Sequence, residues 1–205
     1  MYKNLEKGRS MIEMLGVLAI IGVLSIGGIA GYSKAMEKWK INKTVGEYSM
    51  FAANVIRHID EFNRLNTTVN QYPVVDVVKA LGLVPETWEK MNTQDVRDTW
   101  GNQVGIFVRS GHLQLEIIQG KENGISSRKF CEAMLRDFAQ PLSNVLYMAR
   151  FMRWTSNSDS YYYGNAYCAE DKKCLRDLTN ADINQICNSC VNDENTRYCS
   201  LILNF

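Results

Sequence analysis

The sequence predicts an α+β protein, in which one long N-terminal helix packs on a head that contains an antiparallel sheet and is stapled by disulfides. Three observations lead to this prediction. An apolar run fills residues 11–32, and helix-spaced apolar side chains continue to about residue 66. Strand-like and short helical segments then alternate over residues 67–205, where all six cysteines lie.

The apolar run from Met11 to Tyr32 contains one charged residue, Glu13. Twenty residues of helix span about 30 Å, which is the hydrocarbon thickness of a bilayer. A removable signal peptide has a shorter apolar stretch and would not continue into an amphipathic pattern. A core helix of a soluble protein would keep a polar face. Residues 9–32 are therefore predicted to form a transmembrane helix.

Residues 33–66 continue this helix with an amphipathic pattern. Apolar side chains recur at steps of three and four, and polar ones sit between them. The apolar positions are Tyr48, Phe51, Ala52, Val55, Ile59 and Phe62, and the polar ones are Glu47, Asn54, Arg57, Asp60 and Glu61. We expect one helix from Ser33 to about Leu65, with its apolar stripe packed on the head.

The head, residues 67–205, alternates helical and extended patterns. Helices are predicted over 74–81, 128–139 and 179–187, and strands over 103–109, 113–119, 145–154 and 198–205. The first two strands are joined through Ser110-Gly111-His112, which is a hairpin signal. Residues 156–164, which include Tyr161 to Tyr163, are predicted to form a polar loop.

Charge and motifs restrict the function. The chain has 23 basic and 22 acidic residues, so no excess of cations is available for phosphates, and no nucleic-acid partner is expected. The sequence has no phosphate-binding loop, no HExxH and no GxSxG. His58 and His112 are interpreted as surface or hydrogen-bonded residues. We expect neither an enzyme nor a cofactor.

The six cysteines allow 15 pairings, and spacing alone does not choose among them. Their even number favours disulfides and an oxidising compartment, which places the head outside the cytoplasm. Cys187 and Cys190 also have the spacing of a zinc or redox pair. The gap between Cys168 and Cys174 fits structural zinc poorly, and a redox motif should open a helix after a strand. Disulfides are therefore favoured, and no metal site is expected.

Glu13 is the informative residue of the apolar run. A carboxylate at the bilayer centre costs about 2.5–3.5 kcal/mol, so intramembrane charges are functional candidates. Alternatively, Glu13 lies close enough to the end of the span to reach the interface or to pair with Arg9, four residues earlier. The residues alone leave both interpretations open.

Residues 7–36, KGRSMIEMLGVLAIIGVLSIGGIAGYSKAM, resemble the N-terminus of type IV pilins and of the related pseudopilins of type II secretion. Gly8 closes a short charged leader, residues 1–8, and Glu13 is the fifth residue counted from Arg9. The resemblance implies cleavage after Gly8 by a prepilin peptidase and N-methylation of Arg9 as the new terminus. It also implies that Glu13 neutralises the terminal amine of a neighbouring subunit.

The glycines of the same helix replace the helix-breaking proline of many relatives. Gly27 and Gly31 form a small-xxx-small pair suited to close helix contact. Together with Gly22 they are candidate assembly residues. The alternative is that glycines are simply common in membrane helices.

Parts of the head resemble the type IVb branch, which includes the toxin-coregulated and bundle-forming pilins. The matching residues are Val84-Pro85, the segment Asp98 to Asn102, and Phe130-Cys131-Glu132. The resemblance implies a disulfide between Cys131 and Cys187. The pairs Cys168–Cys174 and Cys190–Cys199 would then close local loops.

The expected function is that of a structural subunit of a type IV pilus-like filament. Its expected partners are itself and other pilins, the prepilin peptidase, the inner-membrane assembly platform and, before assembly, membrane lipid. The precursor would cross the bacterial inner membrane once, with its head in the periplasm. The alternatives are a minor pilin or type II secretion pseudopilin and, more distantly, a single-pass protein with a zinc or redox head.

Overall fold

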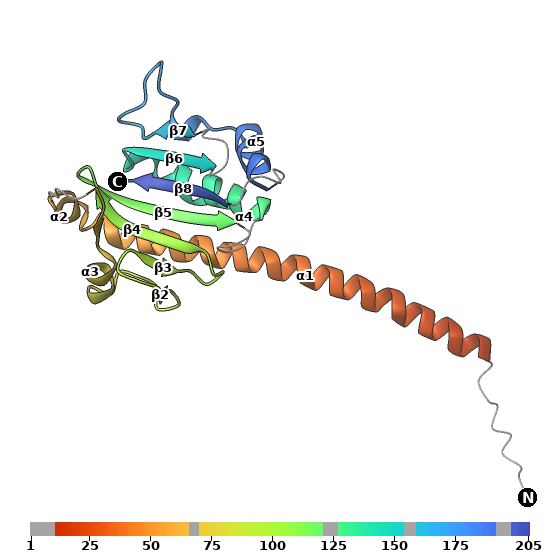
Figure 1. Cartoon of the computed structure of the whole chain (residues 1–205). Coiled ribbons are helices and arrows are strands. Elements are labelled where there is room, and N and C mark those ends of the chain that lie inside the picture. The colour runs from red at the N-terminus through yellow and green to blue at the C-terminus, as the bar shows by residue number, and fades with distance from the viewer. Residues whose placement is uncertain (1–10, 66–69, 121–126, 154–158, 192–197) are drawn as a thin grey trace, which may run out of the picture. The chain divides into compact units, whose positions relative to one another are not determined.

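The structure is a computed structural model that describes residues 11–65, 70–120, 127–153, 159–191 and 198–205 (Figure 1). The chain forms two compact units, Met1–Lys40 and Ile41–Phe205, which are described separately below. Gly8 and Arg9, with which the processing prediction is concerned, lie outside the described residues.

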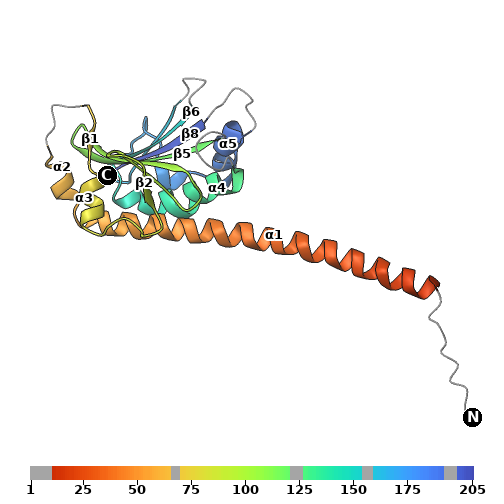
Figure 2. The ribbon, with the colours of Figure 1, turned by 60° about the horizontal axis from the view of Figure 1, so that its bottom comes forward.

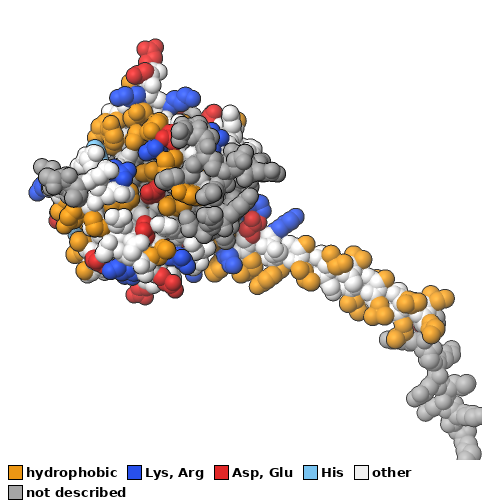
Figure 3. Space-filling view, viewed as in Figure 1, with side chains coloured by type: hydrophobic (Ala, Val, Ile, Leu, Met, Phe, Trp, Pro, Cys, Tyr) orange, Lys and Arg blue, Asp and Glu red, His pale blue; other side chains and the backbone are white. Residues whose placement is uncertain are grey.

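The described residues of the N-terminal unit form the first part of helix α1, which spans Met11–Ile56. The helix is continuous through all the glycines of the apolar run, because glycine lacks the ring by which proline breaks a helix. Every residue from Met11 to Ala35 is exposed. Figure 3 shows hydrophobic side chains along the visible side of this stretch. The long N-terminal helix predicted from the sequence is thus confirmed.

Helix α1 ends nine residues earlier than the predicted Leu65. Its last residue is Ile56, and after a turn at Arg57 and His58 a separate short helix, α2, covers Ile59–Asn63. The break redirects Phe62 into the core and brings Asn63 to the sheet, where Asn63 Oδ1 accepts a hydrogen bond from Leu113 N at 2.8 Å. The apolar spacing in the sequence continues without a break through Ile59 and Phe62 and predicts one helix. The contacts of α2 with the rest of the head end the helix at Ile56 instead.

The C-terminal unit contains an eight-stranded sheet among the described residues, and every pairing in it is antiparallel. The strand order is β2-β3-β4-β5-β8-β6-β7, with β1 paired to the free part of β4. The strands are β1 (Tyr72–Pro73), β2 (Glu89–Lys90), β3 (Asp95–Arg97), β4 (Gln103–Arg109), β5 (His112–Gly120), β6 (Met148–Arg153), β7 (Ser160–Tyr163) and β8 (Tyr198–Asn204). The last strand thus lies in the middle of the sheet. An α+β head with an antiparallel sheet is confirmed.

Helices cover one face of this sheet, as the turned view in Figure 2 shows for α4 and for the part of α1 that belongs to this unit. Burial alternates along β5, where Leu113, Leu115 and Ile117 are at most 1% exposed, as expected for a strand with one covered face. In β4 all five central residues are buried. The helical side of the core includes Tyr48, Phe51 and Val55 of α1, together with Phe130, Met134 and Phe138. The helices are α3 (Val75–Ala80), α4 (Arg128–Ala133), η1 (Met134–Ala139), η2 (Gln140–Asn144), η3 (Leu175–Asp177) and α5 (Asn180–Val191).

Several boundaries differ from the sequence prediction. The helix predicted over 128–139 is an α-helix only to Ala133, and it continues as the π-helix η1 and the 3₁₀-helix η2 to Asn144. Met134, Leu135, Phe138 and Ala139 of η1 are all buried in the core. Helix α5 extends past Cys187 to Val191. Strand β6 begins at Met148 and not at residue 145.

The tyrosine-rich segment predicted as a loop contains strand β7. Tyr162 is buried on the core side, whereas Tyr161 on the other side is exposed. Pairing with β6 orders these residues, and such a nonlocal partner leaves no signal in the local composition.

Two turns depend on unusual backbone. Ser110 and Gly111 both have positive φ, 53° and 76°, as a two-residue type I′ hairpin needs between β4 and β5. The predicted hairpin is confirmed, but His112 is already the first residue of β5 rather than part of the turn. At Gly164 a Cβ atom would lie 1.8 Å from Leu146 O, so only glycine allows the chain to pass so close at the end of β7.

Candidate assembly surface and its anchor in the head

The first part of α1 carries an exposed apolar surface. Its large hydrophobic side chains are between 52% exposed, at Ile21, and 86% exposed, at Met11. The helix is long and apolar enough to cross a membrane, with a mean hydropathy of 2.2 in its most apolar window. Apolar surface of this extent is stable only in lipid or against other protein. An interaction surface is therefore the main feature of this unit.

Helical spacing places Glu13 on one face with two of the three candidate glycines. Gly31 follows Glu13 by 18 residues, or about five full turns of 3.6 residues, so both point the same way and lie about 27 Å apart along the axis. Gly27 lies within about 40° of this direction. Gly22 follows Glu13 by nine residues, or about two and a half turns, and lies on the opposite face.

Among the described residues, the three candidate glycines have open space around them. A Cβ atom added at Gly22, Gly27 or Gly31 would meet nothing within 4 Å. Glu13 itself is exposed, in the first turn of α1. The face that carries Glu13, Gly27 and Gly31 is therefore open for a neighbour to approach closely, which is what small residues permit in apolar helix pairs.

Glu47 anchors the second part of α1 in the C-terminal unit. Its carboxylate accepts hydrogen bonds from Thr87 Oγ1 at 3.2 Å, from Trp88 Nε1 at 3.3 Å and from the Thr99 hydroxyl. Lys43 Nζ lies 4.0 Å away, one turn earlier. Sequence periodicity places Glu47 between the apolar positions, but the structure buries it. Its donors come from two distant loops, so no local pattern could reveal the role.

Tyr48, the next residue, makes a second buried connection. Its hydroxyl donates to Asp98 Oδ2 at 2.9 Å, and Asp98 also accepts from Trp100 N, Asn102 N and Asn102 Nδ2, each at 2.8 Å. Gly101, with a φ of 84°, lets the chain turn tightly around this carboxylate. The segment Asp98 to Asn102, on which part of the type IVb resemblance rests, is thus a loop built to receive Tyr48.

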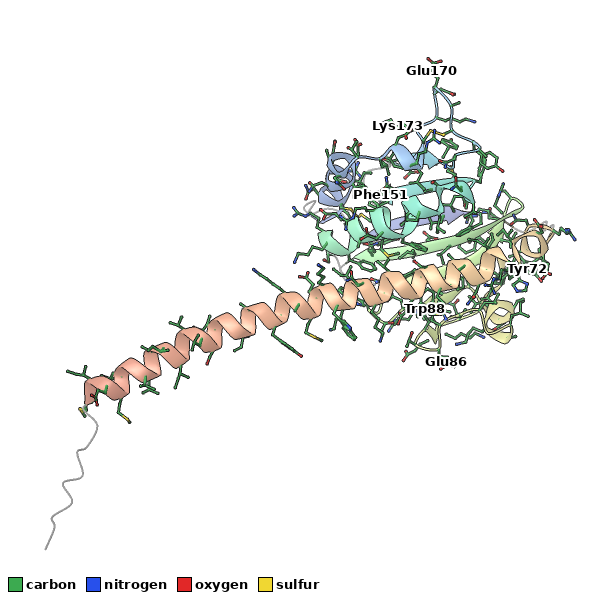
Figure 4. The ribbon with its side chains drawn as sticks, turned by 180° about the vertical axis from the view of Figure 1, so that it is seen from behind. Tyr72, Glu86, Trp88, Phe151, Glu170 and Lys173 are labelled. Carbon is green, nitrogen blue, oxygen red and sulfur yellow. A yellow bond between two sulfur atoms is a disulfide. The ribbon has the colours of Figure 1, made fainter. Side chains whose placement is uncertain are left out.

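Aromatic packing surrounds the anchor. The Tyr48 ring lies 4.7 Å from the Trp88 ring and 5.5 Å from the Phe138 ring, and Phe51 also contacts Trp88 at 5.5 Å. Figure 4 shows Trp88 next to α1, on the helix side of the sheet. The helix is therefore held by buried polar contacts inside an aromatic shell.

Burial shifts the proton affinities in this anchor. Burial raises the pKa of Asp98, and the hydrogen bonds from Asn102, Tyr48 and Trp100 offset part of that rise. Burial also raises the pKa of Tyr48 well above its ordinary value, and the nearby Asp98 carboxylate raises it further. At neutral pH Tyr48 consequently keeps its proton and remains the donor to Asp98.

All six cysteines form disulfides, which join Cys131 to Cys187, Cys168 to Cys174 and Cys190 to Cys199. These are the three pairs that the resemblance to type IVb pilins implies. The first bond ties α4 to α5, across 56 residues, and the other two close local segments of six and nine residues. Cys187 and Cys190, the candidate zinc or redox pair, thus bond to different partners.

The two histidines have structural neighbours. His112 Nδ1 lies 3.0 Å from Phe205 O, and its ring stacks on Tyr147 at 4.8 Å. His58 Nδ1 lies 3.4 Å from Glu61 Oε2 on the surface. Within the described ranges, no three or more His, Cys, Asp and Glu side chains come together as a metal site would need.

Comparisons with protein-family models, with curated proteins and with solved structures found no match.

Proposed function

We propose that the chain is a structural subunit of a type IV pilus-like filament, made as a membrane-anchored precursor and assembled through its N-terminal helix. The observation that carries this proposal is the exposed apolar surface of α1 with a single charge, Glu13, in its first turn. In the precursor this surface would lie in lipid. In the filament the same surface would pack against neighbouring helices.

Glu13 gives such packing a defined register. A carboxylate enclosed by apolar helices is stable only if it is paired, so one position of the neighbouring helix is preferred over the others. The resemblance to pilins supplies the partner, the terminal amine of Arg9 on the next subunit after cleavage behind Gly8. The face shared by Glu13, Gly27 and Gly31 would then be the face of closest approach.

The head would form the outer part of the filament. Three disulfides and the buried hydrogen bonds of Glu47 and Tyr48 would keep the head rigid. Disulfides also suit an oxidising environment outside the cytoplasm. The role is structural and not catalytic.

The test is filament yield in sheared surface material from cells that express single variants. Glu13→Ala and Glu13→Gln should abolish filaments, because the terminal amine of the neighbouring subunit loses the carboxylate with which it pairs. The protein should still accumulate in the inner membrane, because the apolar helix becomes more hydrophobic. Glu37→Gln, on the same helix outside the apolar run, is the matched control and should assemble normally. Normal filaments from both Glu13 variants would refute the proposal.

The glycine face gives a second arm of the same experiment. Gly31→Leu should lower filament yield by at least about tenfold, since leucine would hold neighbouring helices apart. Gly22→Leu, on the opposite face, should have a much smaller effect. Among the described residues, a Cβ atom at either position meets nothing within 4 Å, and the amount of each variant in the inner membrane checks that the fold is kept. Equal yields from the two variants would contradict the assignment of the face.

A further inference from the structure

Two adjoining hollows lie in the C-terminal unit between β7, the Cys168–Cys174 loop and α5. Their volumes are about 340 Å³ and 260 Å³, and they share Tyr162, Lys173 and Asp182 as lining residues. Figure 4 shows Lys173 near α5 and the loop that carries Glu170. Together the hollows form one groove of the size that small ligands occupy.

The walls of the groove are held in place by many local contacts. The Cys168–Cys174 disulfide closes one wall, and Tyr163 N donates to Lys173 O at 2.8 Å. The Gln140 side chain donates to Leu178 O at 2.8 Å on the neighbouring segment. A groove fixed in this way loses little conformational entropy when a ligand binds.

The start of α5 fixes the other wall. Thr179 N donates to Asp182 Oδ2 at 2.9 Å, and Asp182 N donates in return to Thr179 Oγ1 at 3.2 Å. Hydrogen bonds from Thr179 lower the pKa of Asp182, so this carboxylate is ionised and already engaged at neutral pH. The second carboxylate of the lining, Asp177, pairs with Arg176 at 3.5 Å.

The cations of the lining outnumber these engaged carboxylates. They are Arg153, Lys172 and Lys173. Lys172 lies over the Tyr163 ring at 5.2 Å. Among the residues that the structure describes, no carboxylate oxygen lies within 4.0 Å of Lys173 Nζ. Lys173 interacts with Asp182 at longer range, since its charge helps to lower the pKa of that carboxyl. Three cations against two carboxylates still leave the lining with a net positive charge, which favours a ligand with a negative group.

The remaining polar lining suits hydroxyl groups. Ser160, Gln185 and Ser189 contribute two hydroxyls and an amide. The Ser189 hydroxyl donates to Ile186 O at 2.6 Å and Ser160 hydrogen-bonds to Tyr162, so toward a ligand these hydroxyl oxygens serve as acceptors. Burial raises the pKa of Tyr162, which keeps its phenol protonated and able both to donate and to accept. Such a mixture of donors and acceptors along an open groove matches the alternating hydroxyls of a sugar better than it matches an apolar ligand.

An extended peptide fits this place poorly. Peptides commonly bind a sheet edge by adding a strand, which requires free backbone groups. At the end of β7 that edge is already used, since Tyr163 bonds to the loop at Lys173 and forms a bridge with Cys174.

We propose that the groove between β7, the Cys168–Cys174 loop and α5 binds an acidic oligosaccharide, whose carboxylate lies at Lys173 and whose hydroxyls contact Ser160, Gln185 and Ser189. The site belongs to the C-terminal unit alone, and binding does not depend on filament assembly.

The test is calorimetric titration of the full chain in detergent micelles with two probes that share one ring geometry. The first is an α-1,4-linked galacturonate trimer, and the second is the corresponding neutral galactose trimer. The acidic trimer should bind with a Kd below about 1 mM, and the neutral trimer at least about tenfold more weakly. No binding of the acidic trimer up to about 10 mM, or equal binding of both probes, would overturn the proposal.

Variants locate the site. Lys173→Gln should weaken the acidic trimer at least about tenfold, and Gln185→Ala should weaken both trimers. Both side chains are exposed, so an unchanged unfolding midpoint verifies the fold. Lys79→Gln on α3 is the control and should bind like the wild type. Wild-type affinity in Lys173→Gln would overturn the proposal. So would a hexa-aspartate peptide that binds as tightly as the acidic trimer, because the site would then be a general anion or peptide site.

Discussion

The two units of the chain use apolar residues in opposite ways. In residues 11–35 large aliphatic side chains are all exposed, whereas in residues 41–205 the strands and helices bury most of theirs in one core. The same helix, α1, takes part in both arrangements. The apolar residues of 11–35 are available for contact with lipid or other proteins. Those of 41–205 stabilise the fold of the head.

Apolar residues in the second part of α1 should contribute far more to the stability of the fold than those in the first part. Phe51→Ala should lower the free energy of unfolding by about 3–5 kcal/mol, because it leaves a cavity beside Trp88. Leu24→Ala, which removes an exposed side chain, should change it by less than about 0.5 kcal/mol. Urea unfolding of the full chain in micelles, followed by tryptophan fluorescence, measures both. Similar losses would contradict the division.

The disulfides sharpen the same contrast, since all of them lie in the C-terminal unit. Replacing Cys131 and Cys187 together by serine should cost about 4 kcal/mol, because that bond closes a 56-residue segment. The same change at Cys168 and Cys174, six residues apart, should cost about 2 kcal/mol. Unfolding curves of the two double variants decide the order. A larger loss from the short loop would show that strain or packing, and not chain entropy, dominates.

Tyr48 and Tyr32 allow a matched comparison within α1. Tyr48→Phe should destabilise the head by about 1–3 kcal/mol, since Asp98 loses one donor while it remains buried. Tyr32→Phe, at an exposed position of the first unit, should be neutral. The same urea titration applies, and a neutral Tyr48→Phe would show that water or Asn102 replaces the lost hydrogen bond.

The smallest effect is expected from Glu116 on β5. Burial raises its pKa, so the folded state binds the proton more tightly than the unfolded state, and the stability that this provides is lost as the pH rises through the folded pKa. Glu116→Gln should therefore gain stability relative to the wild type as the pH rises from about 4 to about 7. Unfolding measured across this range tests the sign. The exposed Glu86→Gln is the control, and a difference that shrinks with rising pH would contradict the account.

Much of the fold follows from local pattern. The long apolar run predicts the first part of α1, and the alternation in residues 103–119 predicts the hairpin of β4 and β5, because both signals lie within one segment. The helix predicted over 74–81 is also present, as α3. In these elements the backbone hydrogen bonds form within one helix or between two strands that are adjacent in the sequence.

The missed features depend on distant partners. Strands β1, β2 and β3 have only two or three residues each, too few for periodicity to appear. Strand β7 is ordered by β6, and the burial of Glu47 depends on Thr87, Trp88 and Thr99, some 40 to 52 residues away. Within the assembly surface, the sequence identified Glu13 and the glycines. The continuous helix then separated Gly22 from Gly27 and Gly31.

The most direct test of the filament proposal is mass spectrometry of the N-terminal peptide, isolated from native membranes and from sheared surface material. We expect a chain that begins at N-methylated Arg9 in both samples, because cleavage after Gly8 frees the amine that pairs with Glu13. A chain that still begins at Met1 in both samples would contradict it, since Glu13 would then have no such partner and the helix would act only as a membrane anchor.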